Sequence, residues 1–247
     1  MWPVNTVELI YNRNRLRKPV KYSRARDPIS LKENLLNFKK LGKTGIISEF
    51  KRKSPSGFNL EKDIEPIDYF SKAELKNVAG LSILTEPDYF LGKYADITMV
   101  QNLNLPILDK DFVSNNLMVE NAFNSGADAV LFILDFLGVE KVLELSSYAI
   151  SLGMEALVEF HDLMFLDELK PQKGIIYGYN RRNLKTLKME PRESQVLQKH
   201  KESGIEIVLE SGIDSSYLLE NDVSPYLGML IGTSILNGKF LPGDILR

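Results

Sequence analysis

The stretch Gly45-Ile46-Ile47-Ser48-Glu49-Phe50 is the first of eight short apolar runs that decide the fold. These runs are rich in Ile, Val and Leu and lack a clean polar alternation, which is typical of strands buried on both faces. They cover residues 45–50, 80–85, 105–108, 127–134, 156–160, 174–179, 205–209 and 229–235. Because the gaps between them leave room for helices, the spacing predicts alternating strands and helices.

The segments between the runs have helical features. Behind Ser30, apolar residues recur at three- and four-residue spacing, and Glu33 completes a capping-box pattern, which predicts a helix before the first strand. Further helices are predicted over residues 114–125, 139–152, 162–169 and 192–203. Several of these segments end in glycine, as the carboxyl ends of helices often do.

This alternation predicts an α/β chain that forms a single-domain (β/α)8 TIM barrel with an N-terminal helical extension. A doubly wound open sheet is the alternative, but its G-x-G-x-x-G turn is missing after the first run, where the sequence is Lys53-Ser54-Pro55-Ser56-Gly57. No Gly-, Ser- or Pro-rich linker divides the chain. Residues 1–247 are therefore predicted to be one domain, with residues 1–43 as its extension and extra helix.

Composition narrows the function classes. The 247 residues are 44% hydrophobic and 26% charged, as in ordinary globular proteins, and the formal net charge is −2. That charge speaks against nucleic-acid binding, and no apolar run nears the roughly 20 residues that cross a bilayer. The absence of cysteine excludes a thiolate nucleophile and a cysteine-based metal site. Chemistry therefore falls to carboxylates, lysines and hydroxyls.

The N-terminal region carries seven basic residues and no acidic one between positions 13 and 26. A solvated leader packed along the domain surface is the favoured interpretation, with a transit peptide or a nucleic-acid arm as alternatives. The lack of a secretory signal and of cysteine predicts a cytoplasmic protein. A monomer or a weak homo-oligomer is expected.

Polar residues stand where the runs end, and the active site of such a barrel lies at the carboxyl ends of its strands. Any single polar residue of this kind could belong to a solvated loop. Burying each polar group without a partner would cost several kcal/mol. We therefore expect these residues to converge on one another and on a ligand. Charged or amide groups end six runs: Glu49 with Lys51, Glu86, Asp109 with Lys110 and Asp111, Glu159, Asn180 with Arg182, and Glu210.

Two glycine-containing turns indicate a phosphate. Ser211-Gly212 and Gly232-Thr233-Ser234 follow the last two runs, where barrels commonly bind phosphate through backbone N–H groups. Ordinary turn glycines would explain either pair alone. Together, and with Arg182 and Lys51 near the same rim, they predict a phosphorylated small-molecule substrate.

Seven segments resemble, in order, the motifs of the indole-3-glycerol phosphate synthase family: residues 47–57 (ISEFKRKSPSG), 82–87, 106–112 (PILDKDF), 126–130, 153–159, 180–184 and 210–213. The resemblance implies a carboxy-lyase of tryptophan biosynthesis that needs no metal or cofactor. Its reaction would convert 1-(2-carboxyphenylamino)-1-deoxyribulose 5-phosphate to indole-3-glycerol phosphate, with loss of carbon dioxide and water.

The same resemblance implies roles for individual residues. Lys110 would protonate the ribulose carbonyl, and Glu159 and Lys51 would serve as base and acid in the dehydration. Crowding by Lys51 would lower the pKa of Lys110, whereas Glu49 and Glu210 would keep the lysines charged. Glu49, Asn180 and Glu210 would position the lysines and the sugar, and Ser54 and Ser56 would lie on the first loop. The phosphate would be held by Ser211, Gly212, Gly232, Thr233 and Ser234, with Arg182 and Lys51 assisting. The anthranilate pocket would be lined by Pro55, Phe90, Phe112 and Leu131.

The chain departs from the family pattern beside Lys110, where Asp109 replaces a basic or apolar residue. This carboxylate either raises the pKa of Lys110 or points away from the site. Tyr177 and Tyr179 stand where the family prefers aliphatic residues.

Two rival functions remain. Other phosphate-binding barrels, such as phosphoribosylanthranilate isomerase, work with a Cys/Asp or Asp/Asp pair, which the lysine-centred rim disfavours. A barrel that only binds its ligand is disfavoured because Lys110 and Glu159 are both present.

Overall fold

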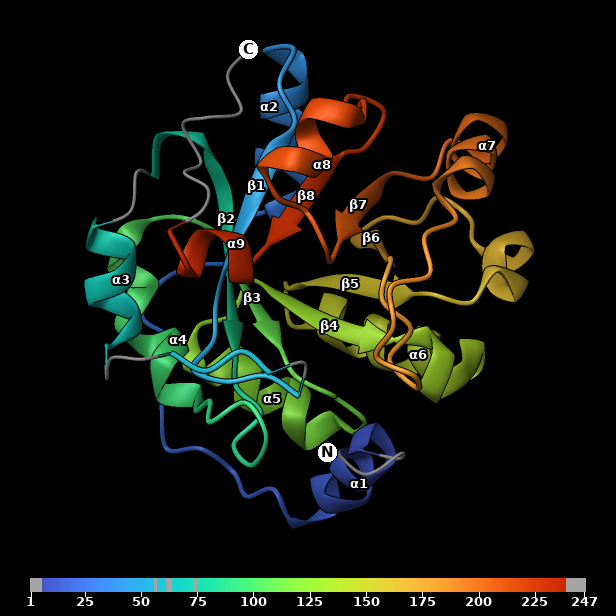
Figure 1. The fold of residues 1–247 in the computed structure, drawn as a ribbon. Coiled ribbons are helices and arrows are strands. Elements are labelled where there is room, and N and C mark those ends of the chain that lie inside the picture. The colour runs from blue at the N-terminus through green and yellow to red at the C-terminus, as the bar shows by residue number, and fades with distance from the viewer. Residues whose placement is uncertain (1–5, 56, 61–63, 73–74, 239–247) are drawn as a thin grey trace.

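Eight parallel strands form a closed barrel in chain order in the computed structural model, which describes residues 6–55, 57–60, 64–72 and 75–238 (Figure 1). The strands are β1 Gly45–Phe50, β2 Val78–Leu84, β3 Ile107–Lys110, β4 Ala129–Ile133, β5 Glu155–Phe160, β6 Ile175–Asn180, β7 Ile207–Glu210 and β8 Gly228–Ile231. The pairing of β1 with β8 closes the ring. The predicted (β/α)8 barrel is therefore confirmed, and the open sheet is excluded.

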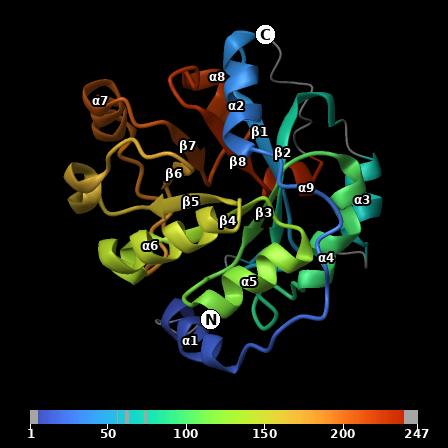
Figure 2. The same cartoon turned by 180° about the vertical axis from the view of Figure 1, so that it is seen from behind.

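Helices surround the barrel (Figure 2). They are α1 Thr6–Arg13, α2 Leu31–Lys40, α3 Pro66–Lys72, α4 Tyr94–Val100, α5 Asn116–Ser125, α6 Leu134–Ser151, α7 Glu193–Ser203, α8 Ser215–Glu220 and α9 Thr233–Leu236, with 3-10 helices η1 Asn14–Leu16, η2 Leu75–Asn77, η3 Gln101–Leu103 and η4 Leu163–Glu168. None of these described helices is long and apolar enough to cross a membrane.

Two predicted elements differ from the structure. The α-helix expected over residues 162–169 is the 3-10 helix η4, which ends just before Pro171, a residue that cannot donate a backbone hydrogen bond. The apolar run at 229–235 does not form a single strand, because Gly232 ends β8 and caps α9.

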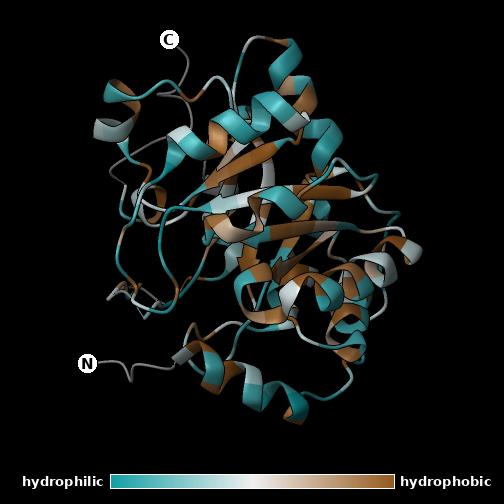
Figure 3. Ribbon diagram, turned by 90° about the vertical axis from the view of Figure 1, so that its right-hand side faces the viewer, coloured by the Kyte–Doolittle hydropathy of each residue, from teal (hydrophilic) through white to brown (hydrophobic). Residues whose placement is uncertain are grey.

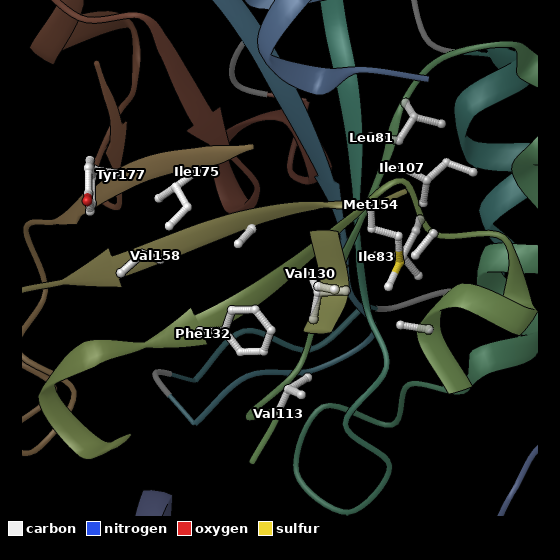
Figure 4. Close-up of a cluster of buried hydrophobic side chains, with 14 of the residues drawn as sticks. Leu81, Ile83, Ile107, Val113, Val130, Phe132, Met154, Val158, Ile175 and Tyr177 are labelled. Carbon is white, nitrogen blue, oxygen red and sulfur yellow. The ribbon is translucent and has the colours of Figure 1, made fainter. Parts of the chain in front are cut away.

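The core has two layers, because successive side chains of a strand point to opposite faces. Outward-facing residues pack beneath the helices, and Figure 4 shows part of this layer, including Ile83, Val130 and Phe132. Inward-facing residues such as Leu108 and Leu157 fill the barrel without any exposed surface. The central strands are accordingly the most hydrophobic part of the ribbon (Figure 3).

Helix α2 closes the amino-terminal end of the barrel. Its Leu31 and Leu35 are fully buried and belong to the inner layer. Glycines near the strand starts make room for them: a Cβ at Gly80 would lie 2.5 Å from Leu31 Cδ1, and one at Gly228 would lie 2.5 Å from Leu35 Cδ2. The helix is therefore a plug of the barrel.

Ion pairs fasten the segment between α1 and α2 to the barrel. Arg24 and Arg26 both pair with Asp128, with 2.6 Å between Arg26 Nη2 and Asp128 Oδ2. Arg17 Nη2 lies 3.0 Å from Asp111 Oδ2. The basic run at residues 13–26 thus packs along the barrel surface, which agrees with the favoured interpretation of the leader.

Leu35→Ala should lower the free energy of unfolding by about 2–5 kcal/mol, because truncation leaves a cavity between α2 and the strand starts. Urea unfolding followed by circular dichroism measures this change. Leu219→Ala, at a side chain that is 87% exposed, is the control and should change it by less than about 0.5 kcal/mol. Equal effects of the two substitutions would contradict the role of α2 as a plug.

Candidate active site

A cavity of about 670 Å³ opens where the eight strands end, a size that suits a small-molecule ligand. The predicted site residues that the structure describes all line it: Lys110, Glu159, Lys51, Glu49, Asn180, Glu210, Ser211, Ser54, Pro55, Phe90, Phe112, Leu131, Arg182, Gly212, Gly232, Thr233 and Ser234. Ser56 lies outside the described residues. The fold thus gathers residues that are as far as 185 positions apart, from Glu49 to Ser234, around one space.

Lys110 lies between two carboxylates. Its Nζ donates to Glu159 Oε2 at 2.8 Å and to Glu210 Oε2 at 3.0 Å. Burial by itself would lower the pKa of Lys110, but the negative charges of Glu159, Glu210 and Glu49 outweigh burial and raise it. The expected lowering by Lys51 is therefore wrong in direction, and the opposing effect of the carboxylates prevails.

The two partners of Lys110 differ in protonation. Burial raises the pKa of Glu210 to about 8, and Glu159 reinforces this shift while Lys110 opposes it. Burial would also raise the pKa of Glu159, but Lys110 and the amide of Asn180 outweigh it, so that pKa is lowered. The arrangement therefore favours an ionised Glu159 beside a protonated Glu210 at neutral pH.

Asn180 fixes the orientation of Glu159. Its Oδ1 accepts the Arg182 N–H at 2.9 Å, so its Nδ2 faces Glu159 Oε1, to which it donates at 2.9 Å. Its backbone carbonyl lies 2.8 Å from Nδ1 of His161. Because a carbonyl only accepts, His161 must carry a proton on Nδ1. We did not predict this residue from the sequence, and its position two residues after Glu159 is the only signal for it.

A second ion pair lies beside the first. Lys51 Nζ donates to Glu49 Oε1 at 2.6 Å. Gly232 makes room for this pair, because a Cβ there would lie 2.3 Å from Glu49 Oε1 and 3.1 Å from Lys51 Nζ. Gly178 does the same for Glu210, whose Oε1 would lie 2.2 Å from an added Cβ. We did not predict Gly178, although a glycine in the middle of a buried strand is a signal of close approach.

One end of the cavity is apolar. Phe90 and Phe112 have ring centroids 5.9 Å apart, and Leu131 lies with them in the cavity wall. Helix α1 adds Val7 and Ile10 to this end. Nothing in the sequence around these two residues signals a site, because their place depends on how the extension folds over the barrel mouth.

The other end of the cavity is rich in backbone amides. Ser211 and Gly212 have positive φ angles of 70° and 65°, and Gly232 is the N-cap of α9. The Ser234 hydroxyl donates to the Ile213 carbonyl at 2.7 Å and so ties the two turns together. This end has the features that bind an anion in other barrels.

Two of the polar residues expected to converge on the cavity do not reach it. The Glu86 carboxylate accepts the N–H groups of Asp88, Tyr89 and Phe90 at 3.0, 2.6 and 2.9 Å and so shapes the loop after β2. Asp109 points away from the cavity, because it alternates with the inward-facing Lys110. Of the two alternatives for Asp109, the structure thus supports the second.

Asp109 forms a buried cluster with Asp111, which lines the cavity. The Thr85 hydroxyl lies 2.6 Å from Asp109 Oδ1 and 3.2 Å from Asp111 Oδ2, so one hydroxyl proton stands between two carboxyl groups. A second proton is needed for both contacts to be hydrogen bonds. Burial, with the charge of Asp111, raises the pKa of Asp109 to about 8, while Thr85 and Arg17 oppose the shift. Asp109 therefore holds the second proton at neutral pH.

Tyr177 and Tyr179 use their hydroxyls outside the barrel. Tyr177 donates to the Lys170 carbonyl at 2.8 Å, and Tyr179 accepts the Arg192 N–H at 2.8 Å. Both departures from the family pattern thus affect the outer layer and leave the cavity unchanged.

In the part of the chain that the structure describes, no three His, Cys, Asp or Glu side chains have the arrangement of a metal site.

Comparisons with known proteins agree with this architecture. A family model described as indole-3-glycerol phosphate synthase matches residues 4–241. The protein of that name from Picrophilus torridus is 43% identical over 232 residues, which are 94% of this chain and 92% of the relative. That from Thermoplasma volcanium is 42% identical over 227 residues, 92% of each chain. The solved tryptophan synthase subunit alpha from Legionella pneumophila has a TM-score of 0.60 at 14% identity, over 87% of this chain and 93% of the other, which shows a shared fold.

The fold and the cavity define a (β/α)8-barrel enzyme, with ionised groups held between an apolar end and an amide-rich end. The match of the family model over nearly the whole chain narrows this class to one member. The chain belongs to the indole-3-glycerol phosphate synthase family.

Asp109→Asn should change how stability depends on pH. The unfolded carboxyl has a pKa of about 3.9, so between about pH 4 and 8 the folded protein holds a proton that the unfolded chain releases. The free energy of unfolding therefore falls as the pH rises through this window. Asparagine removes this effect. The free energy of unfolding of the variant, minus that of the unsubstituted protein, should therefore rise by on the order of 2–4 kcal/mol between pH 5 and 8.

Urea unfolding of both proteins at several pH values measures this difference. Asp167→Asn is the control, because this side chain is 99% exposed, and its difference from the unsubstituted protein should stay flat over the same range. Parallel pH curves for Asp109→Asn and the unsubstituted protein would mean that Asp109 is ionised in the folded state.

Proposed function

We propose that the protein closes the indole ring of 1-(2-carboxyphenylamino)-1-deoxyribulose 5-phosphate, releasing carbon dioxide and water to give indole-3-glycerol phosphate. The observation that carries this proposal is the position of Lys110, whose Nζ lies 2.8 Å from Glu159 Oε2 in a cavity with an apolar and an amide-rich end. Such a cavity matches a substrate with an aromatic ring at one end and a phosphate at the other.

The first step needs an acid. The electron-rich aromatic carbon attacks the ribulose carbonyl, and the carbonyl oxygen must gain a proton as the new carbon–carbon bond forms. Lys110 suits this role, since the charges of Glu159 and Glu49 keep its ammonium group protonated. The ring carboxylate then leaves as carbon dioxide, and its electron pair restores conjugation.

The last step removes water. A base takes a proton from the ring nitrogen or the carbon beside it, while an acid protonates the departing hydroxyl. We assign the base to Glu159, whose lowered pKa keeps it ionised and which Asn180 holds in place. Lys51 is the acid, positioned by Glu49 at 2.6 Å. General acid–base groups of this kind typically contribute about 10²–10⁴ in rate.

The two ends of the cavity hold the substrate. We assign the anthranilate ring to the wall of Pro55, Phe90, Phe112 and Leu131, and the 5-phosphate to the turns at Ser211-Gly212 and Gly232-Thr233-Ser234 with Arg182. All of these residues line the cavity. Ser54 belongs to the first loop and lines the same space. Ser56 is assigned to that loop on the resemblance alone.

We further propose that the protein works in the cytoplasm as a monomer or a weak homo-oligomer. Supporting this, the described residues of one chain close the barrel and line the cavity without a second copy. We also propose that residues 1–247 act as one domain, with residues 1–43 as its extension.

Lys110→Ala and Glu159→Ala should each lower kcat by about two orders of magnitude or more, because each removes a proton-transfer group. The assay follows indole fluorescence from the carboxyphenylamino-deoxyribulose phosphate without added metal. Lys141→Ala, at a lysine whose contact is with Glu144 on the surface of α6, is the control and should leave kcat unchanged.

Near-normal kcat in both variants would overturn the assignment of roles. Absence of product with the unsubstituted protein, despite tight binding of the substrate, would instead favour a barrel that only binds its ligand.

A further inference from the structure

Arg181 is a buried cation next to the cavity that does not line it. Its neighbour Arg182 is in the cavity wall, whereas the Arg181 side chain turns away and is only 10% exposed. There its Nη1 donates to the carbonyls of Ser211 and Gly212, at 3.2 and 3.0 Å. A single guanidinium thus donates hydrogen bonds to two successive peptide groups of the turn after β7.

The direction of these carbonyls decides what faces the cavity. In a trans peptide group the C=O and the next N–H point in opposite directions. Because the carbonyls of Ser211 and Gly212 point at Arg181, the N–H groups of Gly212 and Ile213 point the other way, toward the cavity that these residues line. Among the described residues, no carbonyl or side chain accepts either N–H. Two successive free N–H groups form a concave anion site.

The backbone of this turn needs a brace. Ser211 has a φ of 70°, in the left-handed region that residues other than glycine rarely adopt. Such a conformation persists only where the surroundings over-determine it. The two hydrogen bonds from Arg181 supply that constraint.

Arg181 is itself fixed on two further sides. Its Nε lies 2.6 Å from Glu193 Oε1 at the start of α7, and its guanidinium carbon lies 4.0 Å from the ring centroid of Tyr217 in α8. Tyr217 also donates to Glu193 Oε1 at 3.4 Å. The side chain therefore cannot swing into the cavity without losing these contacts.

We propose that Arg181 is a positioning residue for the substrate phosphate: by holding two carbonyls outward, it presents the N–H groups of Gly212 and Ile213 to the anion. This inference rests on the proposed function, in which the same turn binds the phosphate. The positive charge also polarises both peptide groups and makes their N–H groups better donors. Arg181 thus acts on the phosphate through the backbone and not by direct contact.

The test compares Arg181→Met with Lys185→Met, which removes a positive charge from the same loop, at an exposed side chain outside the cavity wall. Isothermal titration calorimetry gives the Kd of inorganic phosphate, and the fluorescence assay gives KM and kcat. Arg181→Met should raise Kd and KM about tenfold or more, with kcat changed less than about threefold, as expected for weakened hydrogen bonds to a charged group. Lys185→Met should change Kd and KM less than about twofold.

Arg181→Lys separates positioning from charge. Lysine keeps the charge, but its single nitrogen cannot replace both Nη1 at the two carbonyls and Nε at Glu193. If Arg181 positions the turn, this variant resembles Arg181→Met in Kd and KM. A lysine variant that matches the unsubstituted protein would overturn the positioning role.

Chemical rescue distinguishes the loss of the Arg181 contacts from a general loss of structure. Arg181→Ala leaves a gap between the two carbonyls, Glu193 and Tyr217, and millimolar guanidinium should restore the lower KM, whereas ammonium at equal ionic strength should not. A misfolded variant would respond to neither cation, and failure of rescue in a variant with an unchanged melting temperature would count against the inference.

The outcomes also separate this inference from the proposed function. If the unsubstituted protein turns over the substrate and binds phosphate, and Arg181→Met does both equally well, only the inference is overturned. If the unsubstituted protein does neither, the proposed function falls, and the inference falls with it.

Discussion

The closure of β1 against β8 is the constraint on which the rest of the molecule depends. A closed parallel barrel has no free edge, and it forces all eight carboxyl ends to meet at one mouth. Lys110 can therefore touch Glu159 and Glu210, which are 49 and 100 residues further along the chain. The same closure divides every strand into an inward and an outward set of side chains, which places Lys110 in the cavity and its neighbour Asp109 outside it.

Charge balance inside the mouth follows from this geometry. Lys110 and Lys51 bring two positive charges among the carboxyl groups of Glu49, Glu159 and Glu210, all of them nearly buried. Leaving a buried charge without a partner costs far more than an exposed ion pair gains. The raised pKa of Glu210 removes the excess negative charge by keeping that carboxyl protonated. The site can thus hold ionised groups among nearly buried carboxyl groups.

Backbone space is as important to the site as its charged groups. Gly178 and Gly232 leave room for Glu210 and Glu49, whose carboxyl oxygens would otherwise meet a Cβ at 2.2 and 2.3 Å. The N-terminal extension adds a wall from α1 and a plug from α2, and the arginines between them neutralise buried acids such as Asp128. Each end of the barrel is therefore completed by a segment that precedes the first strand.

The sequence by itself determined the barrel and about half of the residues that line the cavity. Apolar runs at regular spacing specify strands buried on both faces, and parallel crossovers fix their handedness, so polar residues at the run ends had to meet. Tertiary structure alone decided which of them reach the cavity: Glu86 turns into its own loop, and Asp109 faces the helices. It also set the protonation of Lys110 and Glu210 and the hydrogen bonds of Arg181 to the turn after β7. These properties depend on distances between residues remote in the chain, and electrostatic interactions inside a protein change steeply with distance and burial.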